Sequence, residues 1–207
     1  RKQPFDWYLV FDVEATCDKV PDYPNEIIEF PVVLVCGRTL DIVDEFHSYV
    51  KPTGNPTLSE FCVSLTGIQQ STVDSAPPFT VVLQQFEQWL SQYLPHPFQS
   101  ASFLTDGPWD LRDFMRKQCA RSGIKRPPYM RRWVDLRRTF SKIIQLPSKR
   151  RPNLASMLKH YNMDFDGRPH SGIDDARNIA RLALHMMRSG IKFPENGTER
   201  DDELGPV

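Results

Sequence analysis

Short apolar runs along the chain predict four β-strands. Residues 7–11 form an unbroken apolar run rich in aromatic side chains, which indicates a central strand buried on both faces. Residues 27–36 and 42–50 carry the next two candidates, and prolines and a glycine break the chain soon after position 50. The fourth candidate, residues 101–105, follows much later in the chain.

Apolar residues at helical spacing predict helices between and after these strands. The longest of them covers residues 79–94, and a shorter one at residues 59–65 ends at Gly67. The strand at residues 101–105 leads directly into another helix, whose apolar positions are Leu111, Phe114, Met115 and Cys119. Further helices are predicted at residues 134–144 and 154–158.

The last predicted helix has the clearest boundaries. Ser171 and Asp174 have the spacing of a capping box, and Gly190 ends the helix. Its buried stripe consists of Ile173, Ala176, Ala180, Ala183, Leu184 and Met187. Three early strands, one later strand and the surrounding helices predict an α/β domain with a mixed sheet.

The length of 207 residues suits one domain. Residues 1–193 are predicted to fold, and the polar residues 194–207 are predicted to form a flexible C-terminal tail. No apolar run is long enough to cross a bilayer and the first residues do not form a signal peptide, so we expect no membrane partner. We also expect the protein to be a monomer.

The four cysteines are Cys17, Cys36, Cys62 and Cys119, and no two of them form a CxxC pair. This spacing argues against a zinc site and favours reduced, mostly buried thiols. The expected compartment is therefore reducing, in the cytoplasm, the nucleus or both.

The net charge is zero, but acidic and basic residues are distributed unevenly along the chain. Residues 1–110 carry 5 basic and 15 acidic groups, whereas residues 112–151 carry 14 basic groups and only two acidic ones. An acidic half beside a basic stretch suits a protein that binds cations in one place and a polyanion nearby. Judged alone, the basic stretch fits a solvated helix face equally well.

Asp12 and Glu14 follow the first predicted strand. Side chains alternate along a strand, so both carboxylates are expected on one face. Two neighbouring carboxylates repel each other unless a cation lies between them, and oxygen ligands suit Mg²⁺ or Mn²⁺. A single pair of this kind is more often only solvent-facing, so further acidic residues have to support it.

The second acidic segment follows the strand at residues 101–105. Asp106 stands where a helix N-cap is expected, whereas Asp110 lies inside the helix, where a core argument would not place a carboxylate. We therefore predict that Asp106 caps the helix and that Asp110 binds metal.

The third segment begins with His170 and includes Asp175 in the first turn of the last helix. A single histidine before a helix is usually structural or exposed. Five residues before a spare carboxylate, His170 could instead act as a general base, since its ordinary pKa is near neutrality.

The order D-x-E, then W-D, then H-x₄-D resembles the DEDDh exonucleases of the RNase H-like superfamily. Nearly the whole chain, from about Phe5 to Phe193, is similar to the Eri-type exonucleases of the enhanced-RNAi and 3′-histone-mRNA family. The likeness is carried by FDVEATCD (11–18), EIIEFPVVL (26–34), FCVSLTGI (61–68), LTDGPWD (104–110) and DFDGRPHSGIDDARNIAR (164–181).

The resemblance implies an RNase H-like mixed sheet flanked by helices and a specific set of site residues. Asp12, Glu14, Asp110 and Asp175 would bind two Mg²⁺ ions, for which Mn²⁺ can substitute, and His170 would be the general base. The implied nucleotide-binding residues are Glu14, Ala15, Thr16, Leu65, Thr66, Gly67, Trp109 and His170.

The function implied by the resemblance is 3′→5′ hydrolysis of single-stranded RNA ends or overhangs to nucleoside 5′-monophosphates. Small-RNA silencing, histone mRNA and rRNA 3′-end processing are the contexts that the family suggests, with other RNA-processing proteins as partners. Two alternatives stay open on the sequence alone: a DNA 3′→5′ exonuclease with the same site, and a catalytically inactive RNA-binding domain.

Overall fold

The central strand of the sheet is β1 (Trp7–Phe11), the first predicted strand. In the computed structural model, which describes residues 2–147 and 152–198, β1 pairs antiparallel with β3 (Ile27–Cys36) and parallel with β5 (Ala101–Thr105). The described residues form a seven-stranded mixed sheet in the order β2-β3-β1-β5-β6-β7, and β4 also pairs with β3. The remaining strands are β2 (Glu14–Ala15), β4 (Asp41–Tyr49), β6 (Arg132–Asp135) and β7 (Gly197–Thr198).

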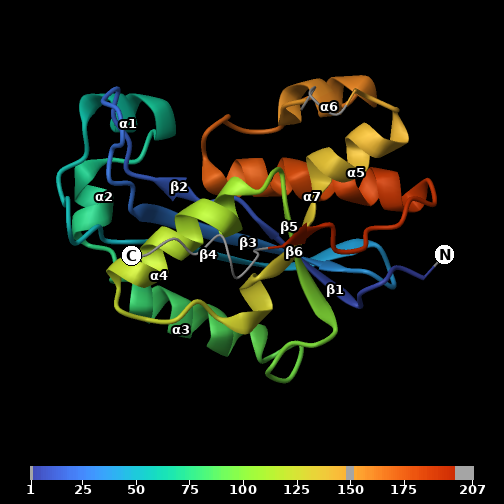
Figure 1. Ribbon diagram of the computed structural model, residues 1–207, viewed down its shortest axis with the longest axis horizontal. Coiled ribbons are helices and arrows are strands. Elements are labelled where there is room, and N and C mark those ends of the chain that lie inside the picture. The colour runs from blue at the N-terminus through green and yellow to red at the C-terminus, as the bar shows by residue number, and fades with distance from the viewer. Residues whose placement is uncertain (1, 148–151, 199–207) are drawn as a thin grey trace.

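Helices cover both faces of this sheet (Figure 1). Leu9 and Phe11 of β1 pack on one face with α3 (Phe79–Leu90), the π-helical segment η1 (Asp110–Met115) and α4 (Arg116–Arg121). Tyr8 and Val10 point to the opposite face, as alternation along a strand requires. This face packs against α5 (Leu136–Ile143), α6 (Leu154–His160) and α7 (Gly172–Arg188). The α/β fold class predicted from the sequence is therefore confirmed.

Two short helices form a separate small layer beside β2, as the left side of Figure 1 shows. Ser59 caps α1 (Glu60–Thr66) by accepting a hydrogen bond from the Cys62 amide at 3.0 Å. Gly67 ends α1 with a φ of 76°, a left-handed conformation that favours glycine. The second helix, α2 (Gln70–Asp74), was not predicted from the sequence.

The structure corrects several predicted boundaries. The helix predicted at residues 134–144 begins as strand β6 and becomes helical only at Leu136, where the Asp135 carboxylate caps it. The helix predicted at residues 79–94 ends at Leu90. Strands β2 and β7, of two residues each, were not predicted, because two residues carry no readable period.

The first residues of the predicted flexible tail are held against the sheet. Glu195 accepts a hydrogen bond from Arg132 at 2.6 Å, and the Asn196 side chain accepts one from the Asp135 amide at 2.6 Å. Strand β7 then pairs with β6. Residues 195–198 are therefore bound to the edge of the sheet, and the rest of the predicted tail lies outside the described residues.

The described residues contain no helix with the length and apolar character that spanning a bilayer requires. The four cysteines are free thiols, and Cys36, Cys62 and Cys119 are buried, in agreement with the sequence-based expectation.

Candidate active site

Three carboxylates meet at the carboxyl end of β1. One oxygen from each of Asp12, Glu14 and Asp175 lies within 4.8 Å of the others. Asp12 follows β1, Glu14 begins β2 and Asp175 lies in the first turn of α7. These three residues are called the carboxylate triad below. A set of oxygen donors this close together can hold a hard divalent cation.

Asp12 and Glu14 lie at a break between two strands, and not on one continuous strand as predicted. β1 ends at Phe11, β2 begins at Glu14, and the pairing of β2 with β3 shifts register after Glu14. The start of α7 approaches this break so closely that a Cβ at Gly172 would lie 2.7 Å from the Asp12 carbonyl oxygen. Glycine at this position therefore allows α7 to bring Asp175 beside Asp12.

Asp110, the fourth predicted carboxylate, is not part of the triad but lines the same cavity. Its side chain is buried, and Oδ1 accepts a hydrogen bond from the Val13 amide at 3.0 Å. Since Val13 lies between Asp12 and Glu14, this bond ties the start of η1 to the segment that carries two triad members.

A carboxylate from β3 holds the amino end of α7, in place of the predicted capping box. Ser171 is the N-cap residue, but its side chain makes no capping hydrogen bond, and Asp174 accepts from the Arg168 amide instead. Buried Glu29 accepts the first two amides of α7 at 2.9 and 3.1 Å. The same carboxylate contacts His47 Nε2 at 2.8 Å. Glu29 therefore fixes where α7 begins, and with it the position of Asp175.

His170 lies beside the triad on the loop that precedes α7. Its side chain is exposed and lines the same cavity as Asp175. Its φ is 62°, and its backbone amide donates a hydrogen bond to the Asp175 carboxylate. The loop thus places an imidazole at the edge of the acidic centre, where it can exchange a proton with a bound water.

The cavity around these groups has a volume of about 570 Å³. Five of the eight predicted nucleotide-binding residues line it: Glu14, Ala15, Leu65, Trp109 and His170. A pocket of this size, with apolar and aromatic walls beside a carboxylate cluster, can accept a nucleotide.

The other three predicted nucleotide-binding residues do not line the cavity. The fully buried Thr16 hydroxyl accepts a hydrogen bond from the Glu26 amide. The Thr66 hydroxyl donates to a carbonyl of its own helix, and Gly67 ends that helix with Arg168 packed against it. Thr16 and Thr66 therefore have local structural roles, each next in sequence to a residue that does line the cavity, Ala15 and Leu65 respectively.

Asp106 does not cap a helix as predicted. The first turn begins at Trp109, which makes no side-chain cap, and Asp106 forms an ion pair with Arg137. Both members of this pair line the cavity. The sequence did not indicate Arg137, because it is one of many basic residues in its segment. Glu29 was missed because its partners lie 143 and 144 residues away.

Burial and mutual repulsion raise the pKa values of the acidic groups. Burial raises the pKa of Glu14 to about 9, with further repulsion from Asp175. Burial likewise raises the pKa values of Asp110 and Asp175 to about 7. The pKa of Asp12 is well above its ordinary value, because of burial and then the charge of Asp110. The carboxylates of the centre repel one another when all of them are ionised, and a bound divalent cation would offset that repulsion.

These shifts predict that, without divalent cations, the stability of the protein falls as pH rises from about 5 to about 9. A carboxyl group with a raised pKa stabilises the native state while it is protonated, and this contribution is lost as pH rises through about 7 for Asp110 and Asp175 and about 9 for Glu14. Thermal unfolding in EDTA should show the fall. Added Mg²⁺ should reduce it most at high pH, and an equal slope with and without metal would contradict a cation site.

Glu29→Gln is expected to lower the free energy of unfolding by about 1–3 kcal/mol, because the new amide group cannot satisfy all the donors that Glu29 accepts. Urea unfolding measures the loss. Glu45→Gln is the matched control, since Glu45 also joins the sheet to α7 through Arg177, but at the surface, where a loss below about 1 kcal/mol is expected. Equal losses would show that Glu29 has no special role.

Comparisons with known proteins identify the family to which the chain belongs. A family model described as "Exonuclease" (RNase T) matches residues 9–183. The chain is 41% identical to human "3'-5' exoribonuclease 1", covering 93% of this chain and 55% of that protein. It is 37% identical to the fission yeast (Schizosaccharomyces pombe) "3'-5' exonuclease eri1", covering 92% of this chain and 71% of that protein. The chain thus spans about half the length of its mammalian relatives.

Solved structures match over almost the whole chain. The nuclease domain of 3'hExo, described as a DEDDh family member bound to rAMP, superposes with a TM-score of 0.90 at 40% identity, covering 96% of this chain and all of that domain. A structure described as 3'-end specific recognition of histone mRNA stem-loop by 3'-exonuclease gives a TM-score of 0.91 at 39% identity, covering 97% of this chain and 70% of that one. From its sequence, its fold and its carboxylate triad, the chain belongs to the RNase T exonuclease family.

Proposed function

We propose that this chain is a 3′→5′ exoribonuclease that hydrolyses single-stranded 3′ ends or overhangs of RNA to nucleoside 5′-monophosphates. The observation that carries the proposal is the carboxylate triad beside Asp110 and His170 in one nucleotide-sized cavity. The relatives named as exoribonucleases and the neighbour bound to rAMP favour RNA over DNA as substrate.

Asp12, Glu14, Asp110 and Asp175 are the proposed ligands of two Mg²⁺ ions. The all-oxygen donor set and the raised pKa values of these groups fit hard divalent cations, and Mn²⁺ should substitute. Bound in this way, the two ions would stabilise the negative charge on the attacking and departing oxygens.

In the proposed mechanism, His170 takes a proton from the attacking water. A bond forms between the water oxygen and the phosphorus, the bond from phosphorus to the 3′ oxygen of the preceding nucleotide breaks, and that oxygen gains a proton from solvent. Its exposed position at the edge of the cavity allows His170 to return its own proton to solvent afterwards. Leu65 and Trp109 contact the base and sugar of the terminal nucleotide and keep the strand end in place.

The direct test is release of nucleoside 5′-monophosphates from a short labelled single-stranded RNA with Mg²⁺. The expected products are single nucleotides removed from the 3′ end, with no release in EDTA. A circular RNA of the same sequence should resist cleavage, because it has no end to enter the cavity.

Matched RNA and DNA oligomers decide between the proposal and its alternatives. Faster hydrolysis of RNA supports an exoribonuclease, whereas faster hydrolysis of DNA would indicate a DNA exonuclease. Binding of RNA without any release in Mg²⁺ or Mn²⁺ would indicate a catalytically inactive domain. Cleavage of the circular RNA would contradict an exonucleolytic mode.

A further inference from the structure

Among the described residues, Arg137 is the one lysine or arginine that lines the cavity of the carboxylate triad. The carboxylates around the same cavity are Asp12, Glu14, Asp106, Asp110 and Asp175. A single cation in such a place has two possible roles. It could only neutralise nearby carboxylates, above all its ion-pair partner Asp106, or it could bind the negatively charged substrate.

The position of the Arg137 guanidinium is fixed from two sides. Nε donates to Asp106 Oδ1 at 3.0 Å and Nη2 donates to Asp106 Oδ2, a two-point contact between side chains that are only 18% and 14% exposed. The guanidinium carbon lies 4.8 Å from the centre of the Trp109 ring. A guanidinium held both by a carboxylate and by an aromatic face keeps one orientation, so the donor that these contacts do not use is also held in a fixed position.

One nitrogen of Arg137 is left for a ligand. The hydrogen bonds to Asp106 use Nε and Nη2, and within the described part of the chain Nη1 has no hydrogen-bond partner. Because the side chain lines the cavity and is not fully buried, Nη1 can reach a group that enters from solvent.

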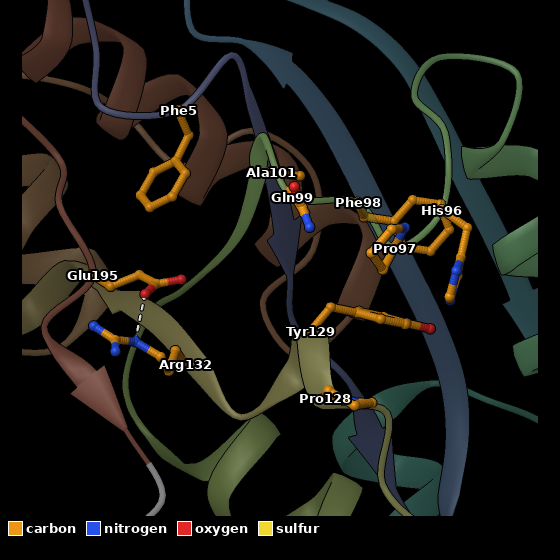
Figure 2. Close-up of a pocket in the computed structure, with 10 residues that line it drawn as sticks. All are labelled: Phe5, His96, Pro97, Phe98, Gln99, Ala101, Pro128, Tyr129, Arg132 and Glu195. Atoms are coloured by element: carbon orange, nitrogen blue, oxygen red, sulfur yellow. Dashed lines mark hydrogen bonds and ion pairs between the residues drawn. The ribbon is translucent and has the colours of Figure 1, made fainter.

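A second arginine–carboxylate pair shows what a surface pair looks like in the same protein. Arg132 and Glu195 line a different cavity, near the amino ends of β1 and β5 (Figure 2). There one hydrogen bond of 2.6 Å joins them, and the Arg132 side chain is 69% exposed. Arg137 differs in having two contacts, an aromatic neighbour and the acidic centre beside it.

Asp106 is a fifth carboxylate around the cavity, and its presence is hard to explain unless Arg137 has a role in the site. Asp106 adds negative charge to a centre that already repels itself, and it raises the pKa values of Asp12, Asp110 and Asp175. Holding a guanidinium in position offsets that cost, because a phosphodiester brings further negative charge that increases in the transition state.

We propose that Arg137, oriented by Asp106 and Trp109, binds a phosphate oxygen of the RNA strand at or next to the linkage that is cleaved. This inference rests on the proposed function, since it assigns a further substrate contact in the same site. Fixed donors aimed at developing charge act mainly on the transition state, so the contact should affect the rate more than ground-state binding.

The test compares Arg137→Gln, Arg137→Lys and Arg132→Gln on one single-stranded RNA over a range of salt concentrations. Arg137→Gln should lower kcat/KM about 100-fold. Loss of one phosphate contact should also make the dependence of log kcat/KM on log salt concentration shallower by about 0.7. Arg137→Lys should keep the wild-type slope, because its charge remains, but not the full rate. Arg132→Gln should match the wild type in both.

The double variant Asp106→Asn/Arg137→Gln separates the two roles of Arg137. If Arg137 only neutralises Asp106, removing both groups restores the rate and the salt slope, and the proposal is wrong. If Arg137 binds phosphate, the double variant stays slow with the shallow slope. If Arg137→Gln strongly lowers the melting temperature because Asp106 is left unpaired, the rate and the salt slope are compared between the double variant and Arg137→Lys instead, since neither leaves Asp106 as an unpaired carboxylate.

The wild-type protein in the same assay distinguishes the two proposals. If it releases no nucleoside 5′-monophosphates, the proposed function fails, and the phosphate contact fails with it. If it releases them while Arg137→Gln keeps the wild-type rate and slope, only the phosphate contact is overturned.

Discussion

Asp12→Asn is expected to abolish nucleotide release and to make the metal-free protein more stable. Asparagine keeps the shape of the side chain but removes a carboxyl group whose ionisation is opposed by burial and then by the charges of Asp110, Asp175 and Glu14. Activity is lost because the triad can no longer hold divalent cations with three carboxylates. Nucleotide release from labelled RNA measures the first effect, and thermal unfolding in EDTA at pH 8 measures the second.

Asp113→Asn is a suitable control for this experiment. Asp113 lies in the same segment as Asp110 but forms a surface ion pair with Arg112. Its replacement should change neither activity nor stability by more than a small amount. If Asp12→Asn hydrolyses RNA at the wild-type rate, the triad has no part in catalysis. If its melting temperature in EDTA is lower than that of the wild type, the carboxylates of the triad do not repel one another.

His170→Asn is expected to lower kcat by about 10²- to 10⁴-fold, the usual effect of losing a general base. Asparagine is the better substitution, because His170 has a φ of 62°, which asparagine tolerates and alanine does not. The exposed imidazole makes little contribution to the core, so the melting temperature should change little. Stopped-time assays at saturating RNA across pH 5–9 measure the rate and its pH profile.

The pH profile distinguishes a general base from a binding residue. With a general base, the wild-type rate depends on deprotonation of the imidazole, and His170→Asn loses that limb of the profile. His185→Asn serves as control, since His185 lies in the last turn of α7, far along the helix from Asp175. A variant that keeps the wild-type kcat but has a raised KM would assign His170 to binding instead.

The sequence predicted the elements whose signals are local. The apolar run of β1 and the ten buried residues of β3 were located with their observed ends, because a strand buried on both faces is apolar along nearly all of its length; Glu29 is the charged exception in β3. β6 was taken for the start of a helix, since four residues followed at once by α5 show no separate period. β7 exists only because of its pairing with β6, which no local pattern encodes.

The same distinction applies to the candidate site. Asp12, Glu14 and Asp175 come together as the motif spacing and the family resemblance predicted. Asp106 was misinterpreted, because its partner Arg137 lies 31 residues further along the chain and an N-cap is the usual local role of such an aspartate. Contacts between distant segments decide the role of each polar residue, and a single sequence does not show them.

The triad joins residues near one end of the described chain to a residue near the other. During synthesis on a ribosome, Asp12 and Glu14 emerge early and Asp175 emerges late, after strands β1 to β6 and helices α1 to α6 have been translated. A growing polypeptide therefore lacks one of the three cation ligands until α7 has appeared. The proposed nuclease activity therefore cannot begin before the last described helix has been synthesised.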